Sequence, residues 1–481
     1  MSLQTVWQLS FEFPGLPSVI VEPAEELFTG DAGLLPLRQL DERLGLSIGF
    51  AAQLQDRRLP ASVVHPLLEM VRSRVFGIVA GYEDQNDHDA LRSDGLFKLI
   101  AGRSPEDDDL ASQPTLSRFE NSVSAHSLLA LEEWFVRRFV DSFAEAPRSL
   151  TLDLDVFDDP THGQQQLTFF HGYYEQYQYL VRMLTCAEND QIAMPVLLHG
   201  TANPTLAADD DLTRVVEALR IKNPDVRIHL RADSGYAAPA IYRVCEQLGI
   251  DYSIGLKMNP VIKCQSASLL QQAERQFEQT GQPQRLFTAF WYQAESWERP
   301  RWVIIKCEAH DQGTNRRAVV TNRPGAQVLP QAAYDEYADR GESENRNKEL
   351  KCHLQADRLS DHRYLANCFR MFLHALAHNL LVHARSLLPE PRLPEPRDEL
   401  PTEALAGSER RRNFSRRRHA DPLGEGHACT WRLMLIKVAA RIVVRARHIR
   451  VLLCGSWPFL DFYQQVGAAV LSPAGPQPDS S

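Results

Sequence analysis

The sequence predicts an α/β fold in which a mixed sheet with flanking helices is interrupted by a β-rich insertion domain and preceded by a helical region. Three observations lead to this prediction. Apolar residues recur at helical spacing in 60–82 and 122–143, strand and helix patterns alternate from 149 to 257, and strand-like segments rich in Trp and Arg lie within 263–330. The 481 residues suffice for about three domains.

Composition and cysteine usage indicate a globular protein of the cytoplasm. Hydrophobic residues make up 44% of the chain and charged residues 24%, as expected for a protein with a sizeable core. The eight cysteines are scattered and form no C-x-x-C pair, which argues for reduced thiols and against a zinc ribbon. The N-terminus lacks a secretory pattern and no apolar run approaches the roughly 18 residues of a membrane span, so we expect neither secretion nor membrane insertion.

Residues 1–145 are expected to form the helical region, and residues 146–262 the first part of the sheet. The segment SLTLDLDVF at 149–157 alternates apolar and polar residues with period two, which is typical of a strand. The elements that follow are strands at 178–186 and 192–200, a helix at 210–222, a strand at 226–233, a helix at 239–249 and a strand at 251–257.

The second half of the chain is predicted to contain four further regions. They are a β-rich insertion domain at 263–330, helices that complete the core at 331–386, a Pro-rich and then basic linker at 387–428, and a basic C-terminal region at 429–481. The whole chain has a net charge of -10, yet residues 408–450 contain twelve Lys or Arg against three acidic residues, a local charge of +9. Such a block is either a solvated tail or a surface that contacts the phosphates of a nucleic acid.

Three aspartates lie on or directly after predicted strands. Asp153 and Asp155 point to the same face of their strand, and a carboxylate on a central strand requires a cation or a hydrogen-bond network. Asp233 ends the strand at 226–233, and the carboxyl ends of strands are where open α/β sheets bind ligands. Each aspartate also has a structural interpretation, as the cap of a turn or of the following helix.

Four polar residues share one stripe of a helix predicted at 337–351, because offsets of three, seven and fourteen residues return to the same face. They are Tyr337, Arg340, Glu344 and Lys351. Taken alone, this stripe is typical of a solvated helix face with pairs at i,i+4. Together with carboxylates from two strands, Glu344 completes an oxygen-only set of ligands that suits Mg²⁺ or Mn²⁺ rather than zinc.

The order of these elements and the spacing Tyr-x2-Arg-x3-Glu-x6-Lys resemble the RNase H-like core of DDE transposases, in particular the bacterial insertion-sequence group with a Tyr-Arg-Glu-Lys signature. The segments DLDVFDDPTHGQQ (153–165), FFHGYY (169–174), LRADSGYA (230–237) and GESENRNKE (341–349) resemble the subgroup with a D-D-P-T-H-G run. The resemblance covers about residues 60 to 455.

By position, the resemblance implies that Asp155, Asp233 and Glu344 are the catalytic residues and bind two Mg²⁺ or Mn²⁺ ions, with Asp153 as the rival for the first place. In one departure, Phe157 stands where the family tends to have Thr. The residues expected to contact DNA are Tyr337, Arg340, Lys348, Lys351, Arg416, Arg417 and Arg418.

The resemblance implies a transposase that binds the terminal inverted repeats of its element through the N-terminal region, cuts the element ends and joins the 3′-hydroxyl ends to target DNA. It also implies double-stranded DNA as the partner, a homodimer in the synaptic complex, and a bacterial protein associated with the nucleoid. Two alternatives remain at this point: an RNase H-like nuclease or resolvase without strand transfer, and an inactive relic that binds DNA.

Overall fold

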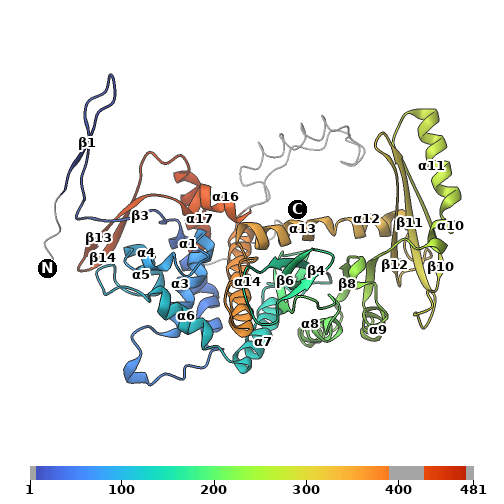
Figure 1. Cartoon of the computed structure of the whole chain (residues 1–481), viewed down its shortest axis with the longest axis horizontal. Helices are drawn as coiled ribbons and strands as arrows, with labels where there is room; N and C mark the ends of the chain where they lie inside the picture. The colour runs from blue at the N-terminus through green and yellow to red at the C-terminus, as the bar shows by residue number, and fades with distance from the viewer. Residues whose placement is uncertain (1–6, 389–426, 473–481) are drawn as a thin grey trace.

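A nine-stranded mixed sheet runs through the middle of the protein, with helices on both of its faces (Figure 1). The computed structural model describes residues 7–388 and 427–472. The strand order is β10-β11-β12-β9-β8-β4-β6-β5, and β7 also pairs with β6. The strands are β4 Ser149–Pro160, β5 Phe169–His171, β6 Gln176–Cys186, β7 Ile192–Leu198, β8 Arg227–Ala232, β9 Asp251–Leu256, β10 Gln284–Tyr292, β11 Arg301–His310 and β12 Gly313–Thr321.

The predicted α/β fold with a mixed sheet is confirmed, and the predicted elements between 149 and 257 all form. Strand β4 is parallel to β8 and β8 is parallel to β9, whereas the other pairs in this sheet are antiparallel. The connecting helices are α8 Ala208–Lys222 and α9 Pro239–Leu248, preceded by the short turn η2 Ser234–Tyr236. In this order the carboxyl end of β8 lies beside the middle of β4, because Ala232 pairs with Leu154.

Alternation along β4 separates a hydrophobic face from a polar one. Leu150, Leu152 and Leu154 are buried against α8 and α9. Asp153, Asp155 and Phe157 point to the opposite face, where α14 (Tyr364–Ser386) packs on the sheet. Phe157 is buried in the core that contains α14, so the ring fills space beneath the helix instead of facing solvent.

Residues 263–330, predicted as a β-rich insertion, form helices as well as strands. Helices α10 Pro260–Gln265 and α11 Ala267–Thr280 precede β10, and α11 was not predicted. Strand β12 pairs with β9, so β10, β11 and β12 extend the central sheet (Figure 1).

The N-terminal region is mainly helical, as its sequence predicts, and it shares a hydrophobic core with α14. A hairpin of β1 and β2 and the strand β3 precede the helices. The elements are β1 Leu9–Phe11, β2 Val19–Val21, β3 Leu27–Thr29, α1 Leu34–Leu44, α2 Leu46–Ala51, η1 Pro60–Ser62, α3 Leu67–Ala80, α4 His88–Leu91, α5 Gly95–Ala101, α6 Gln113–Asn121 and α7 Ala125–Asp141.

The C-terminal segment returns to the N-terminal region and completes a three-stranded sheet of β14, β13 and β3. Its elements are α16 Ala428–Trp431, η5 Arg432–Ile436, β13 Ala440–Arg445, β14 His448–Leu453 and α17 Leu460–Leu471. Three of its basic residues serve the fold: Arg432 donates to backbone carbonyls, Lys437 pairs with Asp31, and Arg441 lies 3.6 Å from Glu26. In the described part of the chain, no helix is both long and apolar enough to cross a membrane. Arg416, Arg417 and Arg418, predicted to contact DNA, lie outside the described residues.

Candidate active site

Asp155, in the middle of β4, lies beside Asp233, which directly follows the carboxyl end of the adjacent parallel strand β8. The register pairs Leu154 of β4 with Ala232 of β8, so the next residue on each strand is an aspartate. The negative charge of Asp233 is one of the causes that raise the pKa of Asp155. The β-β-β-α-β order that the sequence indicates is what places these two carboxylates at one sheet edge.

The carboxylate of Asp155 is buried and receives three contacts. The backbone N–H of Val156 donates to Oδ1 at 2.9 Å, while Ser343 Oγ donates to Oδ2 at 3.2 Å and Arg340 Nη1 lies 3.3 Å from Oδ2. Burial raises the pKa of Asp155 to about 6, even though the Arg340 charge acts in the opposite direction. A further positive charge close to Asp155 would therefore stabilise the ionised form of its carboxyl group.

The side chain of Asp233 caps the turn that follows β8. Its Oδ1 accepts the N–H of Gly235 at 2.9 Å, which matches the turn-capping interpretation. The backbone around it is crowded by β9, because a Cβ on Gly255 would lie 2.6 Å from Tyr337 Oη and 3.0 Å from the backbone N of Ser234. Only glycine at position 255 leaves room on β9 for both the Tyr337 phenol and the Asp233–Ser234 peptide.

The helix predicted at 337–351 is not continuous, and this prediction was wrong. Helix α12 (Pro330–Ala338) ends before Asp339, α13 (Gly341–Lys348) begins after Arg340, and η3 (Glu349–His353) is a π-helical turn. The physical reason is a tightened turn, in which the N–H groups of Arg340 and Ser343 bond to carbonyls three residues earlier, at 3.0 and 2.8 Å. The turn directs the side chains of Arg340 and Ser343 to Asp155.

Arg340 connects the strand carboxylate to the helix carboxylate. Its Nη1 lies 3.3 Å from Asp155 Oδ2 and its Nη2 lies 3.2 Å from Glu344 Oε1. The guanidinium carbon also lies 6.0 Å from the ring centre of Tyr337. Tyr337 on α12 and Glu344 on α13 therefore both lie near the guanidinium of Arg340, which stands between the two helices.

The two lysines expected to contact DNA differ in their surroundings. Lys351 Nζ pairs with Asp158 Oδ1 at 2.7 Å, on the same strand as Asp155. Lys348, at the end of α13, is exposed.

Asp153, the rival of Asp155, is fully buried and bound by two arginines. Arg231 donates to both of its oxygens at 2.7 and 2.8 Å, and Arg346 lies 3.0 Å from Oδ2. Neither arginine was predicted to be part of this site. The sequence carries a signal for one of them, because Asp153-x-Asp155 on β4 and Arg231-x-Asp233 on β8 align in parallel register. The arginines Arg231 and Arg346 tie β4, β8 and α13 together through Asp153.

Comparison with known families adds a decisive observation. The family model described as Transposase DDE domain group 1 matches residues 17–394. This chain belongs to that DDE transposase family. No curated protein matches the sequence significantly. A similar solved structure is the cryo-EM structure of the piggyBac transposase synaptic complex with hairpin DNA, with 10% identity, a TM-score of 0.40, and coverage of 75% of this chain and 77% of that chain.

DDE transposases generally use divalent metal ions, and the chemistry of the three carboxylates in this transposase suits them. Asp155 and Asp233 are neighbours, and Asp155 and Glu344 already share one cation, the guanidinium of Arg340. Within residues 7–388 and 427–472, no group of three or more His, Cys, Asp or Glu side chains is gathered around a common point as a metal cluster is. The three side chains supply the carboxylate oxygens that Mg²⁺ and Mn²⁺ prefer, but in this structure they do not converge on one point.

Proposed function

We propose that this DDE transposase is encoded by a bacterial insertion sequence of the Tyr-Arg-Glu-Lys group and acts through Asp155, Asp233 and Glu344. The observation that supports the proposal is the arrangement of these three side chains: Asp155 on β4 lies beside Asp233 at the carboxyl end of the parallel strand β8, and Glu344 is linked to Asp155 by Arg340. Asp153 is assigned a structural role, because both of its oxygens already bind guanidinium groups.

In the proposed reaction, the three carboxylates hold two Mg²⁺ or Mn²⁺ ions. When bound, such ions activate a water or a 3′-hydroxyl and stabilise the leaving oxygen of an in-line phosphoryl transfer. Arg340, released from Asp155 and Glu344, is then positioned to contact a phosphate of the DNA strand. Tyr337 supplies a phenolic hydroxyl beside Asp233, and Lys348 and Lys351 supply ammonium groups for neighbouring phosphates.

The arrangement of the chain around this site supports the remaining parts of the proposal. The sheet from β4 to β9 with α13 and α14 is proposed to be an RNase H-like core, and residues 263–330 its insertion. The N-terminal region 1–145 is proposed to bind the terminal inverted repeats. Arg445, Arg447 and Arg450 are exposed on the ribbon of β13 and β14, which presents a basic surface for phosphates. A homodimer is proposed because two element ends have to be held together.

The experiment is cleavage and joining of a labelled duplex that carries one end of the element, in Mg²⁺ or EDTA. We expect metal-dependent cleavage and transfer of the 3′ end to a target duplex, and loss of both with Glu344→Gln. Asp311→Asn is a matched control, because Asp311 is 86% exposed and lies in the turn between β11 and β12. Cleavage without joining would support the nuclease instead, and binding of the end without any cleavage would support the relic.

A further inference from the structure

A hairpin that the proposed reaction does not use presents a set of exposed rings to solvent. It comprises residues 167–178, formed by β5, a tight turn and the start of β6. We call it the aromatic hairpin. Tyr173 is 83% exposed, Tyr177 57% and Phe170 52%. The further large side chains exposed on it are Leu167, Phe169 and Tyr174.

Hydrogen bonds and close packing hold the aromatic hairpin in place. At its base the N–H of Thr161 donates to the Tyr177 carbonyl at 2.9 Å, and the N–H of Gly200 donates to the Leu167 carbonyl at 3.2 Å. A Cβ on Gly200 would lie 2.1 Å from the Gln178 carbonyl oxygen, so the loop after β7 can approach this closely only with glycine. At the tip, Glu175 has a left-handed φ of 54° and its N–H donates to the His171 carbonyl at 2.8 Å. The rings are therefore exposed on a folded hairpin with a defined turn.

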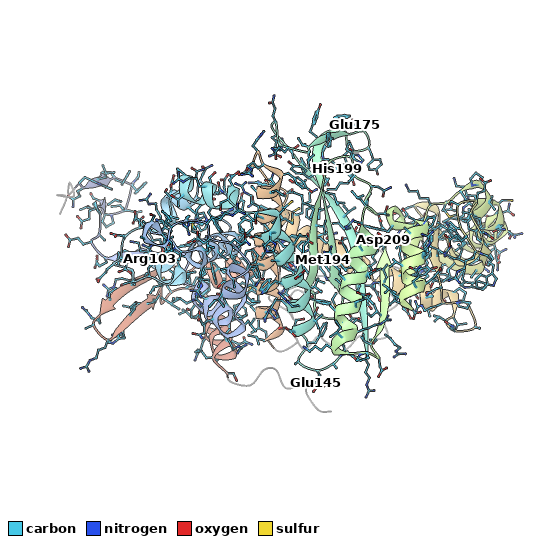
Figure 2. The ribbon with its side chains drawn as sticks, turned by 90° about the horizontal axis from the view of Figure 1, so that it is seen from below. Arg103, Glu145, Glu175, Met194, His199 and Asp209 are labelled. Carbon is cyan, nitrogen blue, oxygen red and sulfur yellow. The ribbon has the colours of Figure 1, made fainter. Side chains whose placement is uncertain are left out.

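The aromatic hairpin lies beside the candidate active site. Gln176 Nε2 donates to Asp158 Oδ2 at 2.9 Å, and Asp158 is three residues from Asp155 on β4. Burial raises the pKa of Tyr174, and the charges of Asp158, Asp233 and Asp155 raise it further, so this ring lies within electrostatic reach of both site aspartates. Figure 2 shows the tip residue Glu175 at the outer end of the sheet, with His199 below it and side chains spreading outward.

The chemistry of the aromatic hairpin suits the faces of nucleobases. The rings contact one another edge to face or tilted, such as Tyr173 with Tyr174 at 5.0 Å and Phe170 with Tyr177 at 5.7 Å, which leaves ring faces open to solvent. Tyr173, Tyr174 and Tyr177 combine an apolar ring with a polar hydroxyl, so a ring can stack on a base while its hydroxyl faces water. Glu175 adds one negative charge at the tip, whereas the charge of Asp158 at the base is balanced by Lys351 at 2.7 Å. Bases within a duplex already have both faces covered by stacking, so only unpaired bases can stack here.

We propose that the aromatic hairpin is a stacking platform for unpaired bases of the DNA strand next to the site of cleavage. This inference rests on the proposed function, because the three carboxylates are what would bring a DNA strand to this edge of the sheet. Stacking of bases on aromatic side chains tolerates any sequence, so the platform would hold a strand without reading it.

The test is binding of fluorescein-labelled forked duplexes to the full-length chain in EDTA, measured by anisotropy. One fork has a flap of thymidines, and a second has abasic residues with the same number of phosphates. We expect the wild type to bind the thymidine fork about five- to hundredfold more tightly. Tyr173→Ala and Phe170→Ala should each lose most of this preference, and Tyr173→Trp should keep it. Ile221→Ala is the control, since Ile221 is 86% exposed on α8, outside the regions proposed to contact DNA.

A second readout separates stacking from a general loss of affinity. With 2-aminopurine as the first flap base, binding by the wild type should quench its fluorescence, whereas binding by Tyr173→Ala should not. Equal affinity for the two forks, binding of neither fork, or an equal loss with Ile221→Ala would overturn the platform. Because no cleavage takes place in EDTA, this binding result is independent of the cleavage assay. A protein that cuts DNA but binds both forks equally would refute the platform alone. A protein that prefers the thymidine fork but never cuts DNA would refute the proposed function alone.

Discussion

Asp155→Asn and Asp153→Asn should change stability in opposite directions, although the two residues are two positions apart on one strand. Burial raises the pKa of Asp155 from 3.8 to about 6, so the folded protein holds this carboxylate ionised at a cost. A shift of about two units corresponds to about 3 kcal/mol, since one unit is about 1.36 kcal/mol. Replacing Asp155 by neutral Asn should therefore stabilise the fold at pH 8 by up to about 3 kcal/mol.

The sign of the pH dependence follows from the direction of this shift. A carboxyl group whose folded pKa is raised costs almost nothing below pH 3.8, and its cost develops as the pH rises from 3.8 to about 6. The gain from Asp155→Asn should be absent near pH 4 and complete above about pH 7. Asp153→Asn should instead destabilise the protein by about 3 to 5 kcal/mol, because it leaves buried Arg231 and Arg346 without their carboxylate.

Urea unfolding followed by tryptophan fluorescence at pH 4 to 8 measures both effects. The reasoning predicts a higher midpoint for Asp155→Asn that grows with pH, and a lower midpoint for Asp153→Asn. It is refuted if Asp155→Asn is destabilising at pH 8, or if its effect does not change between pH 4 and pH 8.

Three further predictions concern other parts of the molecule. Glu349 is buried, yet a hydrogen bond with His427 and the charges of His378 and Arg385 lower its pKa to about 2. Glu349→Gln should therefore lower the free energy of unfolding by about 3 kcal/mol at pH 7. This loss of stability should shrink as the pH falls below 4.5, as measured by urea unfolding. Gly255→Ala should reduce the rate of DNA cleavage about tenfold or more, because the added methyl group would lie 2.6 Å from Tyr337 Oη and displace the phenol. Arg445→Ala and Arg447→Ala should each lower the slope of log affinity against log salt concentration for duplex DNA by about one.

Controls for these three predictions come from the same chain. Glu349→Gln is contradicted by a loss that stays constant down to pH 3. Gly255→Ala is compared with Gly467→Ala in α17, where no heavy atom lies within 4 Å of the added methyl group, and equal cleavage rates for the two would contradict the account of Tyr337. The ribbon arginines are compared with Arg243→Ala, whose guanidinium is paired with Glu298 on the surface, and an equal change in salt slope there would contradict a specific role for the ribbon.

The sequence predicted the part of the fold that local patterns control. The period-two alternation of 149–157 and the capped helices after it give the strands and helices that carry Asp155 and Asp233. The break in the helix at 337–351 could not be predicted, because it depends on contacts of Arg340 and Ser343 with Asp155, about 190 residues earlier in the chain.

Long-range pairing also explains the other differences. Strand β12 pairs with β9 and strand β13 pairs with β3. The sequence of a single strand does not determine which other strand it pairs with. The basic block at 408–450 was expected to be a solvated tail or a surface for phosphates, yet Arg432 and Lys437 within it bind the backbone carbonyl of Val79 and Asp31. A run of basic residues in the sequence shows where positive charge is concentrated, but the role of each side chain depends on the groups that it contacts in the fold.

Binding of Mn²⁺ to the full-length chain, measured by electron paramagnetic resonance, tests most directly whether Asp155, Asp233 and Glu344 form one metal site. The account predicts that Asp155→Asn, Asp233→Asn and Glu344→Gln each weaken Mn²⁺ binding about tenfold or more, consistent with the loss of one carboxylate ligand. Asp311→Asn should have no effect. Unchanged Mn²⁺ affinity in all three site variants would contradict the central claim.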